Sequence, residues 1–207
     1  MAGDPRTRLF CETQAARYAT EGSARPHPAL PGFLARLAPG AHILELGCGA
    51  GTDAAAILAA GFGLDPTDGS AALVRIASER LGRPARLLQF DALEANAAYN
   101  AVWANASLLH VPRPELPDIL ARIRRALRPG GLMFASFKTG DAEGADALGR
   151  YFNQPDPAWL LAACGPGWEL VALTLRRGGG FGGVPTQWLA LTLRRRQPVT
   201  GPPPERR

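Results

Sequence analysis

The stretch ILELGCGAGTD, residues 43–53, decides the fold, because an apolar run leads directly into three glycines within five positions. Residues 41–46 are typical of a short buried strand, and the alanine-rich residues 52–60 of a helix. Glycine lets the backbone adopt positive φ and lets a ligand approach the main chain. The N-terminus of the following helix presents free N–H groups. The stretch therefore predicts a strand, a ligand-binding loop and a helix in succession.

The alternation of strand and helix continues along the chain. Further strands are predicted over residues 62–68, 85–90, 99–105 and 132–137. Helices are predicted over residues 70–82, 113–131 and 156–164. Strands separated by helices of this length imply a parallel sheet with helices on both faces. Two β-rich runs, 168–177 and 186–196, flank a glycine-rich connection and predict an antiparallel C-terminal hairpin. The fold class is α/β, Rossmann-like.

The length of 207 residues suits one sizeable domain with small additions. Residues 1–40, with short helices predicted over 8–20 and 27–39, form an N-terminal helical cap region. Residues 41–196 form the ligand-binding domain. Residues 197–207 are rich in proline and polar residues and are predicted to be a disordered tail.

The basic charge of the chain is concentrated at its end. The net charge is +5, and the last fourteen residues hold five arginines and one glutamate, which leaves about +1 for the rest. The basicity is therefore that of a tail, and no specific nucleic-acid partner is expected. No apolar stretch reaches the roughly 18 residues of a membrane span, and no signal-peptide pattern opens the chain. We expect a cytoplasmic monomer or homodimer without a membrane partner.

The cysteines and the remaining metal-ligating residues indicate no metal site. The three cysteines, Cys11, Cys48 and Cys164, are widely spread and form no CxxC pair. Such a pattern argues against a disulfide framework and against zinc. Cys48 is interpreted as a small residue between glycines and not as a nucleophile. A reducing cytoplasm fits this cysteine usage best.

The spacing of the glycines separates two classes of ligand. Nicotinamide and flavin nucleotides use the pattern G-x-G-x-x-G. Gly47 and Gly49 fit its first two positions, but the third falls on Thr52, and the last glycine, Gly51, comes one place early. Glu45 precedes the loop and would repel a diphosphate, whereas it would attract an ammonium or sulfonium centre. A nicotinamide-dependent oxidoreductase is therefore the less favoured alternative.

Further acidic residues follow the next two predicted strands. Asp68 lies seventeen residues beyond Gly51, where doubly wound folds place the carboxylate that accepts ribose hydroxyls. Asp65 is the rival, but Pro66 is awkward within a strand and Asp68 leads directly into the next helix. Asp91 ends the third predicted strand, and its carboxylate is suited to accept a hydrogen bond from an exocyclic amine of a ligand. Together with Glu45, these acids predict a ligand crevice at one edge of the sheet.

These residues resemble a known family. ILELGCGAG at 43–51, TDGSAAL at 67–73, FDA at 90–92 and ALRPGGLMFASF at 126–137 together are similar to class I S-adenosylmethionine-dependent methyltransferases. The resemblance is close over residues 41–138. AARYAT at 15–20, RYF at 150–152 and QWLALTLRRR at 187–196 are similar to a small bacterial branch near the tellurite-resistance and small-molecule methyltransferases.

The resemblance implies a seven-stranded sheet whose last strand is antiparallel, with S-adenosylmethionine as cofactor and S-adenosylhomocysteine as product. It places the glycine loop and Glu45 at the methionine portion and Asp68 at the ribose. Asp91 and the Ala92 backbone would meet the adenine, Gly69 would flank the ring, and Tyr18 would cover the methionine carboxylate. The implied cofactor-binding residues are Tyr18, Glu45, Gly47, Cys48, Gly49, Gly51, Asp68, Gly69, Asp91, Ala92 and Asn105.

Candidate acceptor-side residues follow the fourth predicted strand. A hydroxyl or ammonium acceptor must lose a proton, and His110 is placed to take it; a structural histidine that bonds the loop is the other interpretation. Asn105 and Ser107 can bond the cofactor amine or the substrate, or form the loop. Arg150 and Tyr151 can face the substrate, or belong to an ordinary helix surface.

The sequence thus predicts an enzyme that transfers a methyl group to a small-molecule acceptor. Methylation of nucleic-acid amino groups is set aside because NASL at 105–108 is not an N/D-P-P-Y/F motif. Cytosine-ring methylation is set aside because no Pro-Cys pair follows the fourth strand. The alternative from another class is a cofactor-binding sensor or partner subunit without activity.

Overall fold

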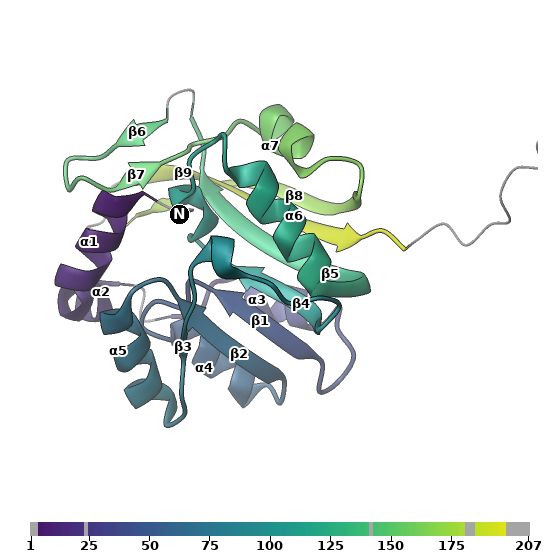
Figure 1. The fold of residues 1–207 in the computed structure, drawn as a ribbon, viewed down its shortest axis with the longest axis horizontal. Helices are drawn as coiled ribbons and strands as arrows, with labels where there is room; N and C mark the ends of the chain where they lie inside the picture. Colours follow the sequence, from purple (N-terminus) through teal and green to yellow (C-terminus); the bar gives the residue numbers. More distant parts are fainter. Residues whose placement is uncertain (1–3, 23–24, 141–142, 181–184, 198–207) are drawn as a thin grey trace, which may run out of the picture.

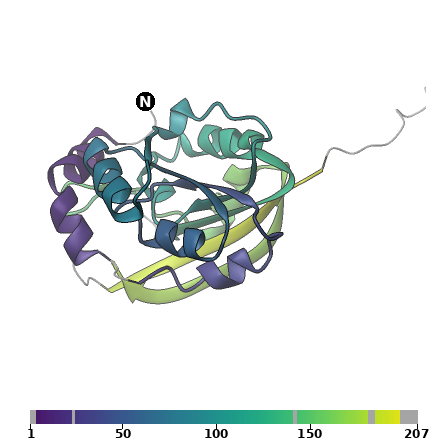
Figure 2. The same cartoon turned by 90° about the horizontal axis from the view of Figure 1, so that it is seen from below.

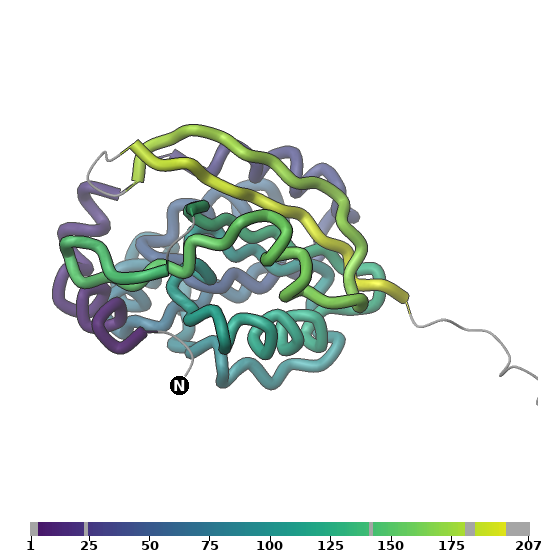
Figure 3. Tube along the Cα trace, turned by 90° about the horizontal axis from the view of Figure 1, so that it is seen from above, coloured from purple at the N-terminus to yellow at the C-terminus, as the bar shows by residue number. Residues whose placement is uncertain are grey.

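A computed structural model describes residues 4–22, 25–140, 143–180 and 185–197. Seven strands form one sheet in the order β3-β2-β1-β4-β5-β9-β8 (Figure 1). They are β1 (His42–Leu46), β2 (Gly63–Asp68), β3 (Arg86–Leu87), β4 (Tyr99–Ala104), β5 (Leu127–Lys138), β8 (Trp168–Gly179) and β9 (Pro185–Arg195). The pairs among β1 to β5 are parallel, and β9 runs antiparallel to both neighbours. Figure 3 shows β8 and β9 side by side over their length. The predicted sheet and hairpin are confirmed.

Helices cover both faces of this sheet (Figure 2). They are α1 (Pro5–Thr13), α2 (Ala15–Glu21), α3 (Leu30–Leu34), α4 (Thr52–Ala59), α5 (Ala71–Leu81), α6 (Leu116–Ala126) and α7 (Pro157–Cys164), with 3-10 turns η1 (Phe90–Ala92) and η2 (Leu108–His110). Side chains of α3 and α4 pack into the apolar core on one face of the sheet, and those of α6 and α7 into the core on the other. The Rossmann-like layering is therefore as expected.

Large apolar side chains fix the sheet between these layers. Trp103 of β4 is fully buried and stacks on Phe134 of β5 at 4.0 Å between ring centroids. Phe33 of α3 packs against Trp103 at 5.2 Å. On the opposite face, Ile119 and Ile123 of α6 belong to the core that contains Val102 and Met133. Burying each such side chain contributes about 1.5–3 kcal/mol.

Several predicted boundaries shift for identifiable reasons. The predicted helix 8–20 is two helices that meet at Gln14, and the predicted helix 113–131 ends at Ala126. Beyond it, Pro129 has no backbone N–H to donate to a helix, and Gly130 has a φ of 79°, which is not helical. The predicted strand 85–90 shortens to β3, because β2 ends at Asp68 and offers only its last two residues for pairing.

Two other segments differ from the expectation. The predicted helix 27–39 contains only the five residues of α3. Residues 151–152 form strand β7, paired with β6 (Gly144–Ala145) in a separate two-stranded sheet, and not a helix surface. Of the predicted disordered tail, only Gln197 lies within the described residues, so the prediction falls outside them. No helix in the described ranges is long and apolar enough to cross a bilayer.

The N-terminal helices are tied to distant parts of the chain. Glu12 of α1 accepts hydrogen bonds from Ser70 Oγ at 2.6 Å and from the Ala72 N–H at 3.2 Å, at the start of α5. The Ser70 bond is the main cause that lowers the pKa of the Glu12 carboxyl. Thr7 Oγ1 accepts a hydrogen bond from the Tyr151 N–H of β7 at 2.8 Å. The segment before β1 is therefore packed on the domain and not a loose extension.

One buried carboxylate joins three segments. Asp53, in the first turn of α4, is 8% exposed. It accepts hydrogen bonds from the His27 N–H at 2.7 Å, from Trp103 Nε1 at 2.8 Å and from Asn105 Nδ2 at 3.0 Å. The N-terminal segment, α4 and the end of β4 therefore share this carboxylate as an acceptor.

Replacing Asp53 by alanine should lower the free energy of unfolding by about 2–4 kcal/mol, because buried donors are left without an acceptor. The matched Asp53→Asn variant keeps the side-chain shape and one acceptor oxygen, so its free energy of unfolding should decrease less than that of Asp53→Ala. Both values come from urea unfolding at neutral pH. An Asp53→Ala protein within about 0.5 kcal/mol of the parent would show that the network adds little.

Candidate functional site

A cavity of about 110 Å³ lies at the carboxyl ends of β1, β2 and β4. The loops that follow these strands form its floor, and helices α1 and α2 form its cover. Residues of the strand loops that line it include Gly47, Gly49, Asp68, Gly69, Ser107 and His110. Residues of the N-terminal helices that line it include Thr7, Arg8, Phe10, Cys11 and Tyr18. The site therefore combines residues far apart in the sequence.

The glycine loop needs its glycines for both backbone geometry and space. Gly47 has φ 79°, and a Cβ there would lie 2.4 Å from Ser107 Cβ, which no real side chain tolerates. Gly49 has φ 54°, and its Cβ would lie 3.1 Å from the ring of Tyr18. Tyr18 is thus packed against the loop backbone, and burial raises its pKa to about 12. The loop leaves main chain, and not side chain, exposed to the cavity.

Asp68 is the acid that the structure brings to the cavity wall. Its Oδ2 accepts the Gly49 N–H and its Oδ1 the Ser70 N–H, both at 2.9 Å. Burial raises its pKa to about 6, while the two N–H donors oppose that shift. Each oxygen retains a second lone pair for a ligand hydroxyl. The rival Asp65 instead accepts from Tyr99 Oη at 2.7 Å and is not among the lining residues.

Glu45 lies beneath the loop and not on the cavity surface. It is 2% exposed, and its Oε2 is a buried atom with no hydrogen bond in the described part of the chain. Burial raises its pKa well above the usual value, and the charges of Asp53 and Asp68 raise it further. Ser107 Oγ is likewise buried without a partner, and Ser107 lines the cavity. These two oxygens suit a ligand that brings cationic or donor groups.

The other predicted cofactor residues surround the cavity without lining it. Cys48 is buried, and burial raises the pKa of its thiol above the usual range, which makes the thiol unreactive. Gly51, with φ 80°, is the N-cap of α4. Asp91 and Ala92 lie in η1, whose first residue, Phe90, lines the cavity instead.

Asn105 has its polar atoms engaged inside the protein. Its Nδ2 donates to Asp53, and its Oδ1 accepts from Ser136 Oγ at 2.7 Å. Ser136 Oγ also accepts the Ala106 N–H at 2.8 Å. Asn105 therefore orients the loop after β4, and its predicted contact with a cofactor amine has no support in these bonds.

His110 has a defined tautomer. Its Nδ1 lies 2.6 Å from the carbonyl oxygen of Tyr151, and because a carbonyl only accepts, Nδ1 carries the proton. Burial lowers the pKa of His110 to about 4, so the ring is neutral at neutral pH. Nε2 then holds a lone pair and makes no hydrogen bond with the described residues. His110 thus offers the cavity a proton acceptor, while its other nitrogen holds β7.

Arg150 and Tyr151 differ in their relation to the cavity. Arg150 lines it, is 7% exposed, and donates from Nε and Nη2 to Asp146 Oδ2 at 3.0 and 2.6 Å. Its guanidinium lies 5.0 Å from the centre of the Phe10 ring. The Tyr151 hydroxyl donates a hydrogen bond to Glu143 Oε2 at 2.6 Å, while the Tyr151 carbonyl accepts one from His110 Nδ1.

Sequence reasoning missed some of the lining residues. Thr7, Phe10 and Cys11 follow the i, i+3, i+4 spacing of one helix face, which would have indicated them. Gln89 also lines the cavity and donates from Nε2 to the Gly69 carbonyl at 2.8 Å. Nothing in the local pattern marks it. Within the described residues, no group of three His, Cys, Asp or Glu side chains is arranged to hold a metal ion.

Comparison with known sequences supports the nature of the domain. Residues 43–131 match a family model described as a methyltransferase domain. The chain is 28% identical over 140 residues to Hemagglutinin 1 of Eikenella corrodens, with 64% of this chain covered. It spans only 46% of that relative's length. The matched family domain contains the glycine loop, Asp68 and His110.

Solved structures share the fold. A S-adenosylmethionine-dependent methyltransferase of Methanosarcina mazei has a TM-score of 0.73 at 14% identity, over 84% of this chain and 100% of its own. The 1,6-didemethyltoxoflavin-N1-methyltransferase of Burkholderia thailandensis, solved with 1,6-didemethyltoxoflavin and S-adenosylhomocysteine bound, has a TM-score of 0.71 at 22% identity. The match covers 91% of this chain and 85% of that one. TehB of Haemophilus influenzae has a TM-score of 0.66 at 14% identity, over 93% of this chain and 67% of its own.

The three lines of observation agree. The strand order places a glycine loop and Asp68 at one cavity, and the family model covers the segment that builds them. The three solved structures named above share the fold, and one of them holds S-adenosylhomocysteine. Residues 43–131 are thus identified as a methyltransferase domain, within a fold that S-adenosylmethionine-dependent methyltransferases share.

Proposed function

We propose that this chain transfers a methyl group from S-adenosylmethionine to a small-molecule acceptor that lies beside His110. One observation carries the proposal: a single cavity is lined by Asp68 and the glycine loop and also by a neutral imidazole with an available Nε2. The first group suits a nucleoside, and the second suits a nucleophile that must give up a proton. A cytoplasmic monomer or homodimer without a nucleic-acid or membrane partner is part of the same proposal.

The residues present fit this cofactor. The backbone of Gly47 and Gly49 can approach the methionine portion, with Tyr18 as its cover. The two Asp68 oxygens have the acceptor capacity that a ribose diol needs. The buried, unpaired Glu45 carboxyl favours a ligand with ammonium and sulfonium charge, because such a ligand stabilises the ionised form of the carboxyl. Cys48, Gly51, Gly69, Asp91 and Ala92 complete the proposed cofactor-binding set, and Asn105 acts through the loop that it orients.

The protein's part in the chemistry is alignment, exclusion of water and acceptance of a proton. S-adenosylmethionine supplies an electrophilic methyl group when bound. The cover formed by α1 limits water, and the Tyr151 carbonyl holds the His110 ring in one orientation. His110 Nε2 accepts a hydrogen bond from the O–H, N–H or S–H of the acceptor. A weak base suffices, because this proton becomes strongly acidic as the new bond to carbon forms.

The solved neighbours support a small acceptor. The toxoflavin-precursor methyltransferase acts on a heterocycle, and a similar fold from Haemonchus contortus binds phosphomonomethylethanolamine. Ser107 and Arg150, which line the cavity near His110, are proposed acceptor contacts, and Tyr151 acts through its carbonyl. A protein that binds S-adenosylhomocysteine but methylates nothing in a panel of thiols, amines, phenols and chalcogen oxyanions would instead be a sensor. Tight NAD binding without a response to the sulfur ligands would overturn the proposal.

Asp68→Asn should weaken S-adenosylhomocysteine binding by about 1–3 kcal/mol, because charge-assisted hydrogen bonds to the ribose are lost. The matched control is Asp65→Asn, three residues earlier on the same strand, and it should bind as the parent does. Calorimetry at pH 8 measures both. Equal weakening of the two variants, or none in Asp68→Asn, would contradict the assignment.

Binding by the parent protein should weaken as the pH falls through about 6, where burial places the Asp68 pKa. The protonated carboxyl loses an acceptor site, so the affinity decreases by up to about tenfold per pH unit below that point. Asp68→Asn should lack this step, and any slope that it retains reports other groups, Glu45 among them. Superimposable pH profiles for the two proteins would refute the role of Asp68.

His110→Asn should lower turnover by about 10²–10⁴-fold with S-adenosylhomocysteine affinity nearly unchanged. The asparagine amide can donate to the Tyr151 carbonyl in place of Nδ1, but it offers no atom at the Nε2 position. Turnover is measured with an acceptor found in the panel. Unchanged turnover together with a loss of stability would make His110 a structural residue.

A further inference from the structure

Lys138 is the sole lysine among the 23 lysine and arginine residues of the chain. It is the last residue of β5, at the carboxyl end of the sheet, next to the segment that holds His110. Lysine and arginine differ in function, because an ammonium is a compact point charge and a guanidinium a broad planar fork. All the remaining basic residues of this kind are arginines, so the ammonium at position 138 is chemically distinct from them.

The ammonium of Lys138 has no carboxylate partner within the described residues. It is half-buried, and its Nζ lies 3.8 Å from the centre of the Phe152 ring. The nearby acids already have partners: Glu143 with the Tyr151 hydroxyl, and Asp146 with Arg150. Burial and the charge of Arg150 both lower the pKa of Lys138. The Phe152 ring stabilises the ammonium through a cation–π contact, which leaves the ammonium able to bind an anion as well.

The surroundings of Lys138 form a second cavity, of about 450 Å³. Beside the ammonium, Gln154, Thr139 and Gln187 line it with polar side chains. The carboxylates of Glu143 and Asp146 also line it, and they are paired with Arg113 and Arg150. It is therefore suited to a hydrated, polar group and not to an apolar one. It is distinct from the cofactor cavity, whose lining does not include these residues.

The two cavities share a wall. The Phe152 ring contacts both the His110 ring, at 4.8 Å between centroids, and the Lys138 ammonium, at 3.8 Å from its centre. Arg150 lines the cofactor cavity, while its ion-pair partner Asp146 lines the second one. The Lys138 ammonium therefore lies close to His110, the residue that would receive the acceptor's proton, because both contact the same phenyl ring.

We propose that Lys138 binds a carboxylate or phosphate group of the methyl acceptor, so that the enzyme selects small acidic molecules. This inference rests on the proposed function, because the other end of the same molecule must reach His110.

The test compares an acid with its neutral isostere on protein saturated with S-adenosylhomocysteine. The probes are 4-hydroxybenzoate and 4-hydroxybenzamide, which differ only in the charged group. Calorimetry should show the acid binding at least about tenfold more tightly to the parent, as for a charge-assisted contact. Lys138→Met should remove this preference. Equal binding of the two probes by the parent, or a preference kept by Lys138→Met, would overturn the proposal.

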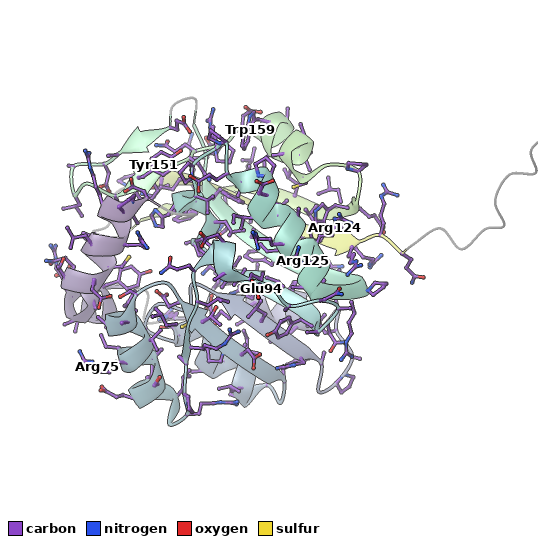
Figure 4. The ribbon with its side chains drawn as sticks, viewed as in Figure 1. Arg75, Glu94, Arg124, Arg125, Tyr151 and Trp159 are labelled. Atoms are coloured by element: carbon purple, nitrogen blue, oxygen red, sulfur yellow. The ribbon has the colours of Figure 1, made fainter. Side chains whose placement is uncertain are left out.

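Arg75→Met is the matched control. Arg75 is exposed on α5, away from Tyr151 and β7 in Figure 4, and the variant has the same net charge as Lys138→Met. It should keep the preference for the acid, and loss of the preference here would show a general charge effect. S-adenosylhomocysteine binding by each variant is measured separately. Failure of that binding in the parent would count against the cofactor assignment and not against the anion site.

A second measurement does not depend on the fold of a variant. Reductive methylation with ¹³C-formaldehyde labels Lys138 as the sole lysine, beside the terminal amine, and the label keeps the charge. Titration with sodium acetate and with sodium phosphate distinguishes the two kinds of anion. Saturable shifts of the lysine signal with either, but not with chloride, are expected. Shifts that grow linearly with all three salts would refute an anion site.

Discussion

The hydrogen bonds to Asp53 are the constraint on which the site depends. This carboxylate fixes Asn105, which is bonded to Ser136, and Ser136 in turn accepts the Ala106 N–H. Ala106 has φ 51°, a left-handed conformation that costs a residue with a side chain roughly 1–3 kcal/mol. The network offsets that strain and directs the next residue, Ser107, against Gly47. The first and fourth strand loops therefore meet at a contact that only glycine permits.

The same loop continues into η2, where a second set of bonds fixes His110. Asn153 is fully buried and donates from Nδ2 to the carbonyls of Leu108 and Val111, both at 2.9 Å. Its own N–H donates to the Leu109 carbonyl at 2.8 Å. These bonds hold β7 against the turn, which places the Tyr151 carbonyl at the imidazole. The proton position on His110 thus follows from the docking of a short strand that pairs with none of the strands of the main sheet.

Local patterns predicted the part of this arrangement that local chemistry determines. The glycine loop and the acid at the end of β2 are each written within a few residues, so the strand–loop–helix unit and the place of Asp68 could be inferred. Asp53 could not, because its partner Trp103 lies fifty residues away. The sequence left the role of Arg150 undecided between a substrate contact and a helix surface for the same reason. Its burial depends on Phe10 and Asp146, and β7 is too short to leave a periodic signal. Lys138 stood out only by composition, as the one lysine.

Charge is distributed unequally between the two ends of the site. Acids gather at the end with the glycine loop, where burial raises the pKa of Glu45 and the charges of Asp53 and Asp68 raise it further. This concentration of acids favours a cationic ligand. Cations gather at the other end, where burial lowers the pKa of His110 and the charges of Arg150 and Lys138 lower it further. The cations that make His110 a weaker base also stabilise an anionic nucleophile, so less basicity is needed for its deprotonation. A neutral histidine with a low pKa is therefore consistent with proton acceptance from an acidic acceptor, and poorly suited to an aliphatic ammonium.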